Sequence, residues 1–211
     1  GCRRRRQRRR RGGQYQRGAV TAVLLRELVF EDFGVYRGRQ AIDLCPPTAA
    51  RPIVLFGGFN GAGKTTFLNG LNLALYGKRA AQVGRTRADY EAYLRDAIHR
   101  GASKQKGAAL ELLFDATYDG KPAEFRVRRY WYVGTNDQIL DHLAVFHNGD
   151  KSTFLTDHWD EVVEEILPLE ISSLFLFDGE KIEALADPEQ ASHVTRTAIE
   201  SLLGLSLLDR L

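Results

Sequence analysis

The 211-residue chain has no methionine, only two cysteines, and no apolar run near the roughly eighteen residues that a membrane-spanning helix needs. Cys2 and Cys45 have no paired spacing, so neither a disulfide framework nor a zinc site is expected. No basic segment precedes an apolar stretch and a cleavage site, so no secretory signal is expected. These absences predict a cytoplasmic protein without membrane contact. The missing Met at position 1 indicates an artificial boundary, a processed end or a wrongly extended gene start, with the natural chain beginning near Val20.

Acidic residues are absent from the first 11 positions, where eight arginines stand. The whole chain carries 30 basic and 27 acidic residues, a net charge of +3; without those arginines the balance is 22 to 27, or −5. The overall charge therefore does not predict a nucleic-acid-binding face. Residues 1–18 are expected to form a flexible arginine-rich tail, because like charges repel and nothing apolar is available to bury. Two origins stay open for it: an artefact or solvated tail, and a native contact with DNA or RNA phosphates.

Hydrophobic periodicity predicts an α/β domain. Because 44% of the residues are apolar, the chain is expected to bury a sizeable core. Two short apolar runs, Ile53–Phe56 and Leu174–Phe177, are typical of strands buried on both faces of a sheet. Helical spacing predicts helices over 64–76, closed by Gly77, over 89–100, over 157–167 and after Pro188. Alternation predicts further strands over 20–33, 40–44, 110–118, 125–131 and 139–146. Asp119-Gly120 is expected to form a hairpin turn, and the strand over 139–146 is expected to end at Asn148-Gly149.

The strongest motif is a glycine-rich phosphate loop, Gly58 to Thr65, which reads GFNGAGKT and matches G-x-x-x-x-G-K-[ST]. An expected buried strand precedes it and an expected helix follows it, so a plain glycine-rich turn is the weaker interpretation. Glycines let several backbone N–H groups converge on phosphate oxygens, and the helix N-terminus adds its positive end. The motif predicts ATP or GTP binding. ATP is favoured because no Asn-Lys-x-Asp segment that reads guanine follows.

Three side chains at the end of this loop have distinct expected roles. Lys64 is expected to reach the β and γ phosphates, the Thr65 hydroxyl to ligate Mg²⁺, and Thr66 to hydrogen-bond the α phosphate. ATP and Mg²⁺ are therefore the expected cofactors. The candidate ATP ligands of the loop are Asn60, Gly61, Ala62, Gly63, Lys64, Thr65 and Thr66.

Turnover also needs an acid that positions Mg²⁺ and a group that orients water. The segment Leu174–Asp178 looks like the strand and acid of a Walker B motif, which makes Asp178 a catalytic candidate beside Lys64. Gly179 follows Asp178, however, so a water-activating glutamate is displaced to Glu180, and no Leu-Ser-Gly-Gly-type signature occurs in the chain.

The phosphate loop with Thr66, together with the preceding segment Leu28–Gly38, resembles the N-terminal lobe of an SMC-like ABC ATPase head. The resemblance runs from about Val20 to Leu211. Within that group, four segments resemble the DndD family, the ATPases of bacterial DNA phosphorothioation, or sulfur modification. These segments are Phe33–Gly38, Leu75–Arg79, Ile98–Gly101 and Phe177–Ile182.

The resemblance implies roles for two residues outside the loop. Asp178 would stand in the Q-loop, which contacts Mg²⁺ and relays the state of the γ phosphate, although the usual glutamine is an aspartate here. As a Q-loop residue or as a Walker B acid, Asp178 would lie near the metal, since carboxylates suit Mg²⁺; a strand-end aspartate that starts a turn is the plain alternative. Arg37 matches the basic residue of the first hairpin turn, which contacts nucleotide; a solvated hairpin arginine is equally compatible.

The resemblance also implies a fold class and partners. The fold would be the N-terminal lobe of an ABC/SMC-like P-loop head, with a mixed sheet and antiparallel hairpins over residues 19–197 and the start of a coiled-coil helix over 198–211. The signature and Walker B segments would lie in a C-terminal lobe beyond that coiled coil. Two such heads would sandwich ATP as a homodimer that acts on DNA with other sulfur-modification proteins, so that the lobe alone binds ATP without turning it over.

Other functions stay open. The chain could belong to an SMC-like repair or anti-phage ATPase, or be a self-contained P-loop NTPase or kinase with Asp178 as its Walker B acid. It could also be a non-catalytic module in which ATP only joins subunits. The run Arg126–Tyr132 could stack on nucleic acid, but alternation along a strand with one solvated face explains it equally well. The five histidines have no metal-site spacing.

Overall fold

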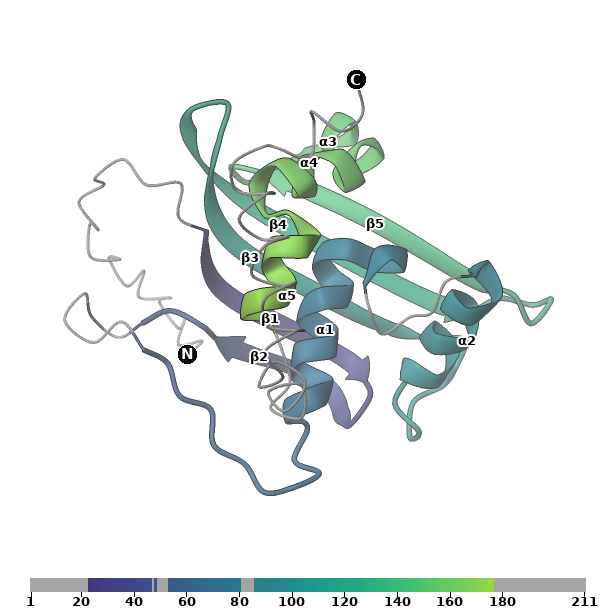
Figure 1. The fold of residues 1–211 in the computed structure, drawn as a ribbon. Coiled ribbons are helices and arrows are strands. Elements are labelled where there is room, and N and C mark those ends of the chain that lie inside the picture. The colour runs from purple at the N-terminus through teal and green to yellow at the C-terminus, as the bar shows by residue number, and fades with distance from the viewer. Residues whose placement is uncertain (1–22, 47, 49–52, 81–85, 177–211) are drawn as a thin grey trace, which may run out of the picture.

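The computed structural model describes residues 23–46, 48, 53–80 and 86–176. Its centre is a six-stranded sheet in the order β2-β1-β3-β4-β5-β6 (Figure 1). Every pairing between neighbouring strands is antiparallel. The strands are β1 (Leu24–Phe33), β2 (Tyr36–Asp43), β3 (Ala108–Tyr118), β4 (Lys121–Val133), β5 (Ile139–His147) and β6 (Asp150–Ser152).

The helices gather on one face of this sheet, as Figure 1 shows. The longest, α1, packs close to β1 at Gly70, where an added Cβ would stand 2.5 Å from the Phe30 ring. No helix in the described part of the chain is long and apolar enough to cross a membrane. The helices are α1 (Lys64–Tyr76), the short 3₁₀ turn η1 (Gly77–Arg79), α2 (Arg87–Ala97), α3 (Thr153–Asp157), α4 (Trp159–Ile166) and α5 (Leu169–Phe175).

The predicted hairpin turn at Asp119-Gly120 is confirmed, and the predicted strand end at Asn148-Gly149 is a second hairpin turn, leading to the short strand β6. Asp119 and Gly120 join β3 to β4, and Asn148 and Gly149 join β5 to β6. All four residues have φ between 50° and 93°, the left-handed conformation that the central positions of a type I′ turn require. Asparagine, aspartate and glycine tolerate that conformation best, so these local sequences fix the register of both hairpins.

The core lies between the helices and the covered face of the sheet. Two buried tryptophans join neighbouring elements through their indole N–H groups. Trp131 on β4 donates to the Leu94 carbonyl in α2 at 2.7 Å, and Trp159 on α4 donates to the Leu75 carbonyl in α1 at 2.8 Å. Each ring is 1% exposed. A large buried ring stabilises the fold by about 2–3 kcal/mol. The Trp131 bond holds α2 against the sheet, and the Trp159 bond holds α4 against α1.

The prediction of a buried strand over Ile53–Phe56, here called the entry segment, is wrong. Its residues form no regular secondary structure, and Ile53, Leu55 and Phe56 are 79%, 90% and 47% exposed. In Figure 1 the blue chain that leads into α1 runs outside the sheet. An apolar strand needs a neighbour to pair its backbone and cover its side chains, and no described strand runs beside this one. The sheet is consequently antiparallel throughout the described residues, not mixed as expected.

The expected strand over Leu174–Phe177 is also not formed in its described part. Leu174 and Phe175 belong to α5, and Leu176 continues the helical hydrogen bonding by donating its N–H to the Ser172 carbonyl at 2.7 Å. A short apolar run fits a helix as well as a strand, and periodicity alone does not separate them. Phe177 and Asp178 lie outside the described residues.

Candidate nucleotide-binding site

The phosphate loop, Gly58 to Thr65, leads directly into α1. Gly61 and Gly63 have φ of 81° and 99°, which only glycine adopts without strain, so the motif's glycines serve the backbone path. Gly63 is the N-cap of α1; no side-chain hydrogen bond caps it, and the first turn contains no acidic residue. The exposed N-terminus of a 13-residue helix is thus left for an anion, which the helix dipole favours.

Lys64 lies across this loop. Its ammonium donates to the carbonyl oxygens of Gly58 at 2.9 Å and Phe59 at 3.0 Å, while the side chain remains exposed. The Ala62 N–H also bonds the Phe59 carbonyl at 3.0 Å, which closes a tight turn within the loop. The cation is therefore held at the loop's rim by neutral acceptors. A phosphate oxygen is a stronger, charged acceptor at the same place.

The two threonines that follow occupy different environments. Thr65 is exposed in the first turn of α1. Thr66 is half-buried and turns its methyl group toward the first hairpin, where a Cβ added to Gly34 would stand 2.5 Å from Thr66 Cγ2. The loop and helix start present an exposed lysine, backbone N–H groups and a threonine hydroxyl, a donor set that fits a nucleotide phosphate with Mg²⁺. The described residues contain no separate group of three or more acidic, histidine or cysteine side chains that could hold a metal.

The tip of the first hairpin, Asp32–Gly38, packs against the end of the phosphate loop. The Tyr36 hydroxyl donates to the Gly63 carbonyl at 3.0 Å, and an added Cβ on Gly63 would stand 2.7 Å from Val35 Cγ2. Sequence reasoning missed Tyr36, because this contact joins residues 27 positions apart. The nearest sequence signal is the pair of hairpin glycines, Gly34 and Gly38, whose positive φ angles shape the tip.

Asp32 holds this tip from within. Its buried carboxylate accepts the Lys106 ammonium at 2.6 Å and the Gly38 N–H at 2.7 Å. The Lys106 hydrogen bond, followed by that of Gly38, lowers the pKa of Asp32 below its ordinary value, against the opposing effect of burial. The carboxylate is therefore ionised at neutral pH and braces the hairpin beside the loop.

Two predicted site residues, Arg37 and Asp178, lie outside the loop in sequence. Arg37 is exposed on β2, one position after Tyr36, and its Nε lies 4.0 Å from where a Cβ on Gly101 would stand. Adjacent strand residues point to opposite faces, so Tyr36 makes the loop contact and the nucleotide role of Arg37 stays a prediction. Asp178 lies outside the described residues, and its metal role also stays a prediction.

The Arg126–Tyr132 run splits between the two faces of β4. Arg129 and Trp131 point into the core, at 6% and 1% exposure. On the open face, Arg126 pairs with Glu111 at 3.5 Å, and the Tyr130 ring stacks on His142 at a centroid distance of 4.6 Å. Strand alternation thus accounts for the cluster.

Comparison with known families places the site in context. The sequence profile of the AAA domain family matches residues 27–203, which include the whole phosphate loop, α1 and the hairpin tip. The chain belongs to this family. Membership supports nucleotide binding through the P-loop, and an AAA-type ATPase domain agrees with the α/β architecture. A search of curated proteins found no match.

Proposed function

We propose that the chain is the ATP-binding lobe of an SMC-like ATPase head that couples ATP binding and hydrolysis to work on DNA. The observation that carries the proposal is the phosphate loop itself. Lys64 is exposed at its rim and held by two carbonyl oxygens, in front of an uncapped helix N-terminus. The AAA domain match over residues 27–203 supports the same chemistry.

A head assembled from more than one lobe is supported by the surface around this loop. Ile53 and Leu55 of the entry segment are 79% and 90% exposed, Phe59 in the loop is 92% exposed, and Val35 in the hairpin tip is 52% exposed. Large exposed apolar side chains of this kind favour an interaction surface. A C-terminal lobe would pair the entry segment as a strand, and a second head would close over the nucleotide. A self-contained NTPase would instead bury the strand that carries its own loop.

In this proposal ATP drives two heads together and hydrolysis releases them, so that the nucleotide controls a clamp on DNA. The catalytic groups would be Lys64 and Asp178, with Thr65 and Asp178 on Mg²⁺. The chain alone would bind ATP without turning it over. The segments that resemble the DndD family favour DNA phosphorothioation, with the other sulfur-modification proteins as partners.

The first test is ATP affinity, measured by calorimetry with Mg²⁺. Lys64→Ala should abolish binding, because it removes the charge that neutralises the β and γ phosphates. Lys121→Ala is the matched control, since Lys121 is an exposed lysine at the start of β4 in another hairpin. Undiminished affinity in a folded Lys64→Ala variant would contradict the proposed site.

The second test is hydrolysis, measured for the chain alone and after addition of the separately produced C-terminal lobe. Turnover only in the mixture supports a composite head. Robust turnover by the chain alone would indicate a self-contained NTPase, and binding without turnover in the mixture would indicate a nucleotide-gated module.

The third test addresses the DNA reaction. The DNA of cells that carry the wild-type gene, or the Lys64→Ala allele, is digested and analysed by mass spectrometry for phosphorothioate-linked dinucleotides. The proposal expects these dinucleotides in the wild type and their loss in the variant. Unmodified DNA in the wild type, together with ATP turnover, would favour a repair or anti-phage ATPase.

A further inference from the structure

The hydrogen bond between Tyr36 and Gly63 acts on the peptide unit that opens α1. The carbonyl of Gly63 and the N–H of Lys64 belong to one planar trans peptide, so they point in opposite directions. Tyr36 donates to this carbonyl at 3.0 Å, and the Phe67 N–H of the first helical turn donates to it at 2.8 Å. Two donors hold the oxygen on the protein side. The Lys64 N–H is thereby aimed away from the protein, toward the open end of the helix.

Gly63 itself adds little restraint to this peptide. Its φ of 99° and ψ of 15° lie in the left-handed region, where glycine has wide freedom and no side chain to restrain it. Val35 and Tyr36 fill the space that a side chain would take, within 2.7 Å and 3.1 Å of the Cβ position. The neighbouring hairpin therefore supplies the restraint that the glycine lacks.

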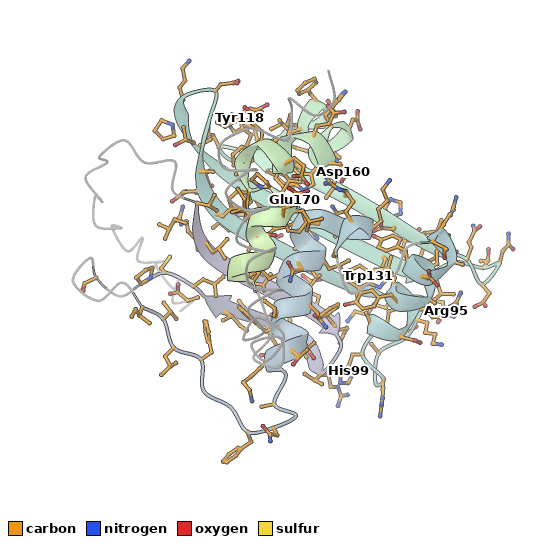
Figure 2. The ribbon with its side chains drawn as sticks, in the orientation of Figure 1. Arg95, His99, Tyr118, Trp131, Asp160 and Glu170 are labelled. Carbon is orange, nitrogen blue, oxygen red and sulfur yellow. The ribbon has the colours of Figure 1, made fainter. Side chains whose placement is uncertain are left out.

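Tyr36 is itself held firmly. Its ring stacks on Phe30 of β1 with centroids 4.3 Å apart and an interplanar angle of 17°. The hairpin tip behind it is tied to the end of α2 by two backbone bonds of 2.7 Å, from the Gly34 N–H to the Ala97 carbonyl and from the His99 N–H to the Asp32 carbonyl. Figure 2 shows His99 near the N-terminal end of α1, where these elements meet. The position of the Tyr36 hydroxyl is thus fixed by ring stacking and by the backbone bonds of the hairpin tip.

We propose that Tyr36 is a positioning residue for the phosphate loop: its hydroxyl sets the Gly63–Lys64 peptide in the orientation that receives the nucleotide phosphates. The role rests on the proposed function, in which this loop binds ATP. Tyr36 needs no contact with the nucleotide, because it acts through Gly63.

The test compares Tyr36→Phe with Tyr76→Phe in the full chain. Both tyrosines are packed against the core and donate a hydroxyl to a backbone carbonyl, Tyr76 to that of Leu167 at 2.9 Å, at the other end of α1. Both substitutions keep the ring; Tyr36→Phe removes the bond to Gly63, and Tyr76→Phe removes the bond to Leu167 and the hydrogen-bond interaction with Ser172. ATP affinity should fall about 3- to 10-fold in Tyr36→Phe, the range that one hydrogen bond contributes, and stay at the wild-type value in Tyr76→Phe. Thermal unfolding without nucleotide should show a loss for Tyr76→Phe at least as large as for Tyr36→Phe, because Tyr76 is the more deeply buried of the two.

Hydrogen exchange gives a second readout that a merely structural role would not change. ATP should slow amide exchange over residues 32–38 in the wild type and in Tyr76→Phe, because the bound loop and the hairpin tip are coupled, and should slow it less in Tyr36→Phe.

Equal ATP affinities for wild type and Tyr36→Phe would overturn the positioning role alone and leave the proposed function standing. An equal affinity loss in both variants would also overturn it, since the effect would then follow stability. Failure of the wild-type chain to bind ATP would overturn the proposed function and this role with it.

Discussion

Gly34, at the tip of the first hairpin, touches Thr66 in the first turn of α1: a Cβ added to Gly34 would stand 2.5 Å from Thr66 Cγ2. Real Cβ atoms do not approach another carbon so closely, so this position has no room for any side chain. The backbone of the hairpin tip therefore packs directly against a side chain of α1. Substitutions in the hairpin tip should therefore alter the conformation of the phosphate loop.

Gly34→Ala should destabilise the protein by about 2–4 kcal/mol and weaken ATP binding, because it combines a steric clash at Thr66 with left-handed strain. Gly38→Ala is the matched control: Gly38 has a φ of 64°, close to the 54° of Gly34, but nothing lies within 4 Å of its Cβ position. The control should cost only the strain, about 1 kcal/mol. Chemical denaturation and ATP titration of both variants measure the difference. Equal effects of the two substitutions would show that the Thr66 contact is unimportant.

Asp32 should make stability fall at acid pH. The Lys106 and Gly38 hydrogen bonds hold the pKa of Asp32 below its unfolded value of about 4. A carboxyl with a lowered folded pKa contributes stability above the unfolded pKa, and the contribution disappears as pH falls through the folded value. Asp32→Asn tolerates the φ of 50° and keeps a Gly38 acceptor but does not titrate. Wild type should therefore exceed the variant in stability at pH 6, and the difference should shrink as pH falls below about 4.

The control for this pH experiment is Asp137→Asn. Asp137 also has a positive φ, 56°, and pairs with Arg95, but its side chain is 82% exposed. Exposed pairs contribute little, so this substitution should leave the pH dependence of unfolding nearly unchanged. A stability difference for Asp32→Asn that persists unchanged to pH 2.5 would contradict the ion-pair account.

Sequence reasoning succeeded where the determinants are local. The phosphate loop, helix 64–76 and the Asp119-Gly120 turn each depend on residues a few positions apart, whose conformational preferences are set by glycine and hydrogen-bonding side chains. The α2 helix begins at Arg87, two residues before the expected start, because Thr86 and Asp89 form a capping box.

Sequence reasoning failed where a residue's structure depends on contacts with residues distant in the chain. The entry segment has the composition of a buried strand, but no described strand pairs with it, and composition does not reveal the missing neighbour. Tyr36 had no local signal either, since its role depends on the hairpin packing against Gly63. The run Arg126–Tyr132 does not reveal which of its arginines is buried; Arg129 is, and it donates to the Ala74 carbonyl at 3.2 Å. Tertiary packing decides such positions, and local pattern does not report it.

Leu55→Glu should separate folding from assembly. Leu55 is 90% exposed in the entry segment, so a charge there should change the stability of the chain by no more than about 0.5 kcal/mol. If a second lobe covers this segment, the buried charge should abolish co-purification with that lobe and ATP turnover in the mixture. Phe154→Glu, on α3 and 62% exposed, is the matched control and should leave assembly intact. Normal assembly of Leu55→Glu would contradict a docking role for the entry segment.

The contact between Gly77 and Arg129 predicts a non-additive pair of substitutions at the other end of α1. A Cβ on Gly77 would stand 2.7–2.8 Å from the Arg129 guanidinium, which is buried and has little room to move. Arg129→Ala should cost about 2–4 kcal/mol, because it leaves a cavity and unpairs the Ala74 carbonyl. Gly77→Ala should cost a similar amount through the clash and its φ of 54°.

The double variant should be less destabilised than the two single costs together, because removing the guanidinium makes room for the Gly77 methyl group. The expected coupling is about 1–2 kcal/mol, which a double-mutant cycle by urea denaturation resolves. Additivity within about 0.3 kcal/mol would mean that the guanidinium does not pack on Gly77 in solution. A strong coupling would establish that Arg129 of β4 fixes the C-terminal end of α1 on the sheet, opposite the end that Tyr36 contacts beside the phosphate loop.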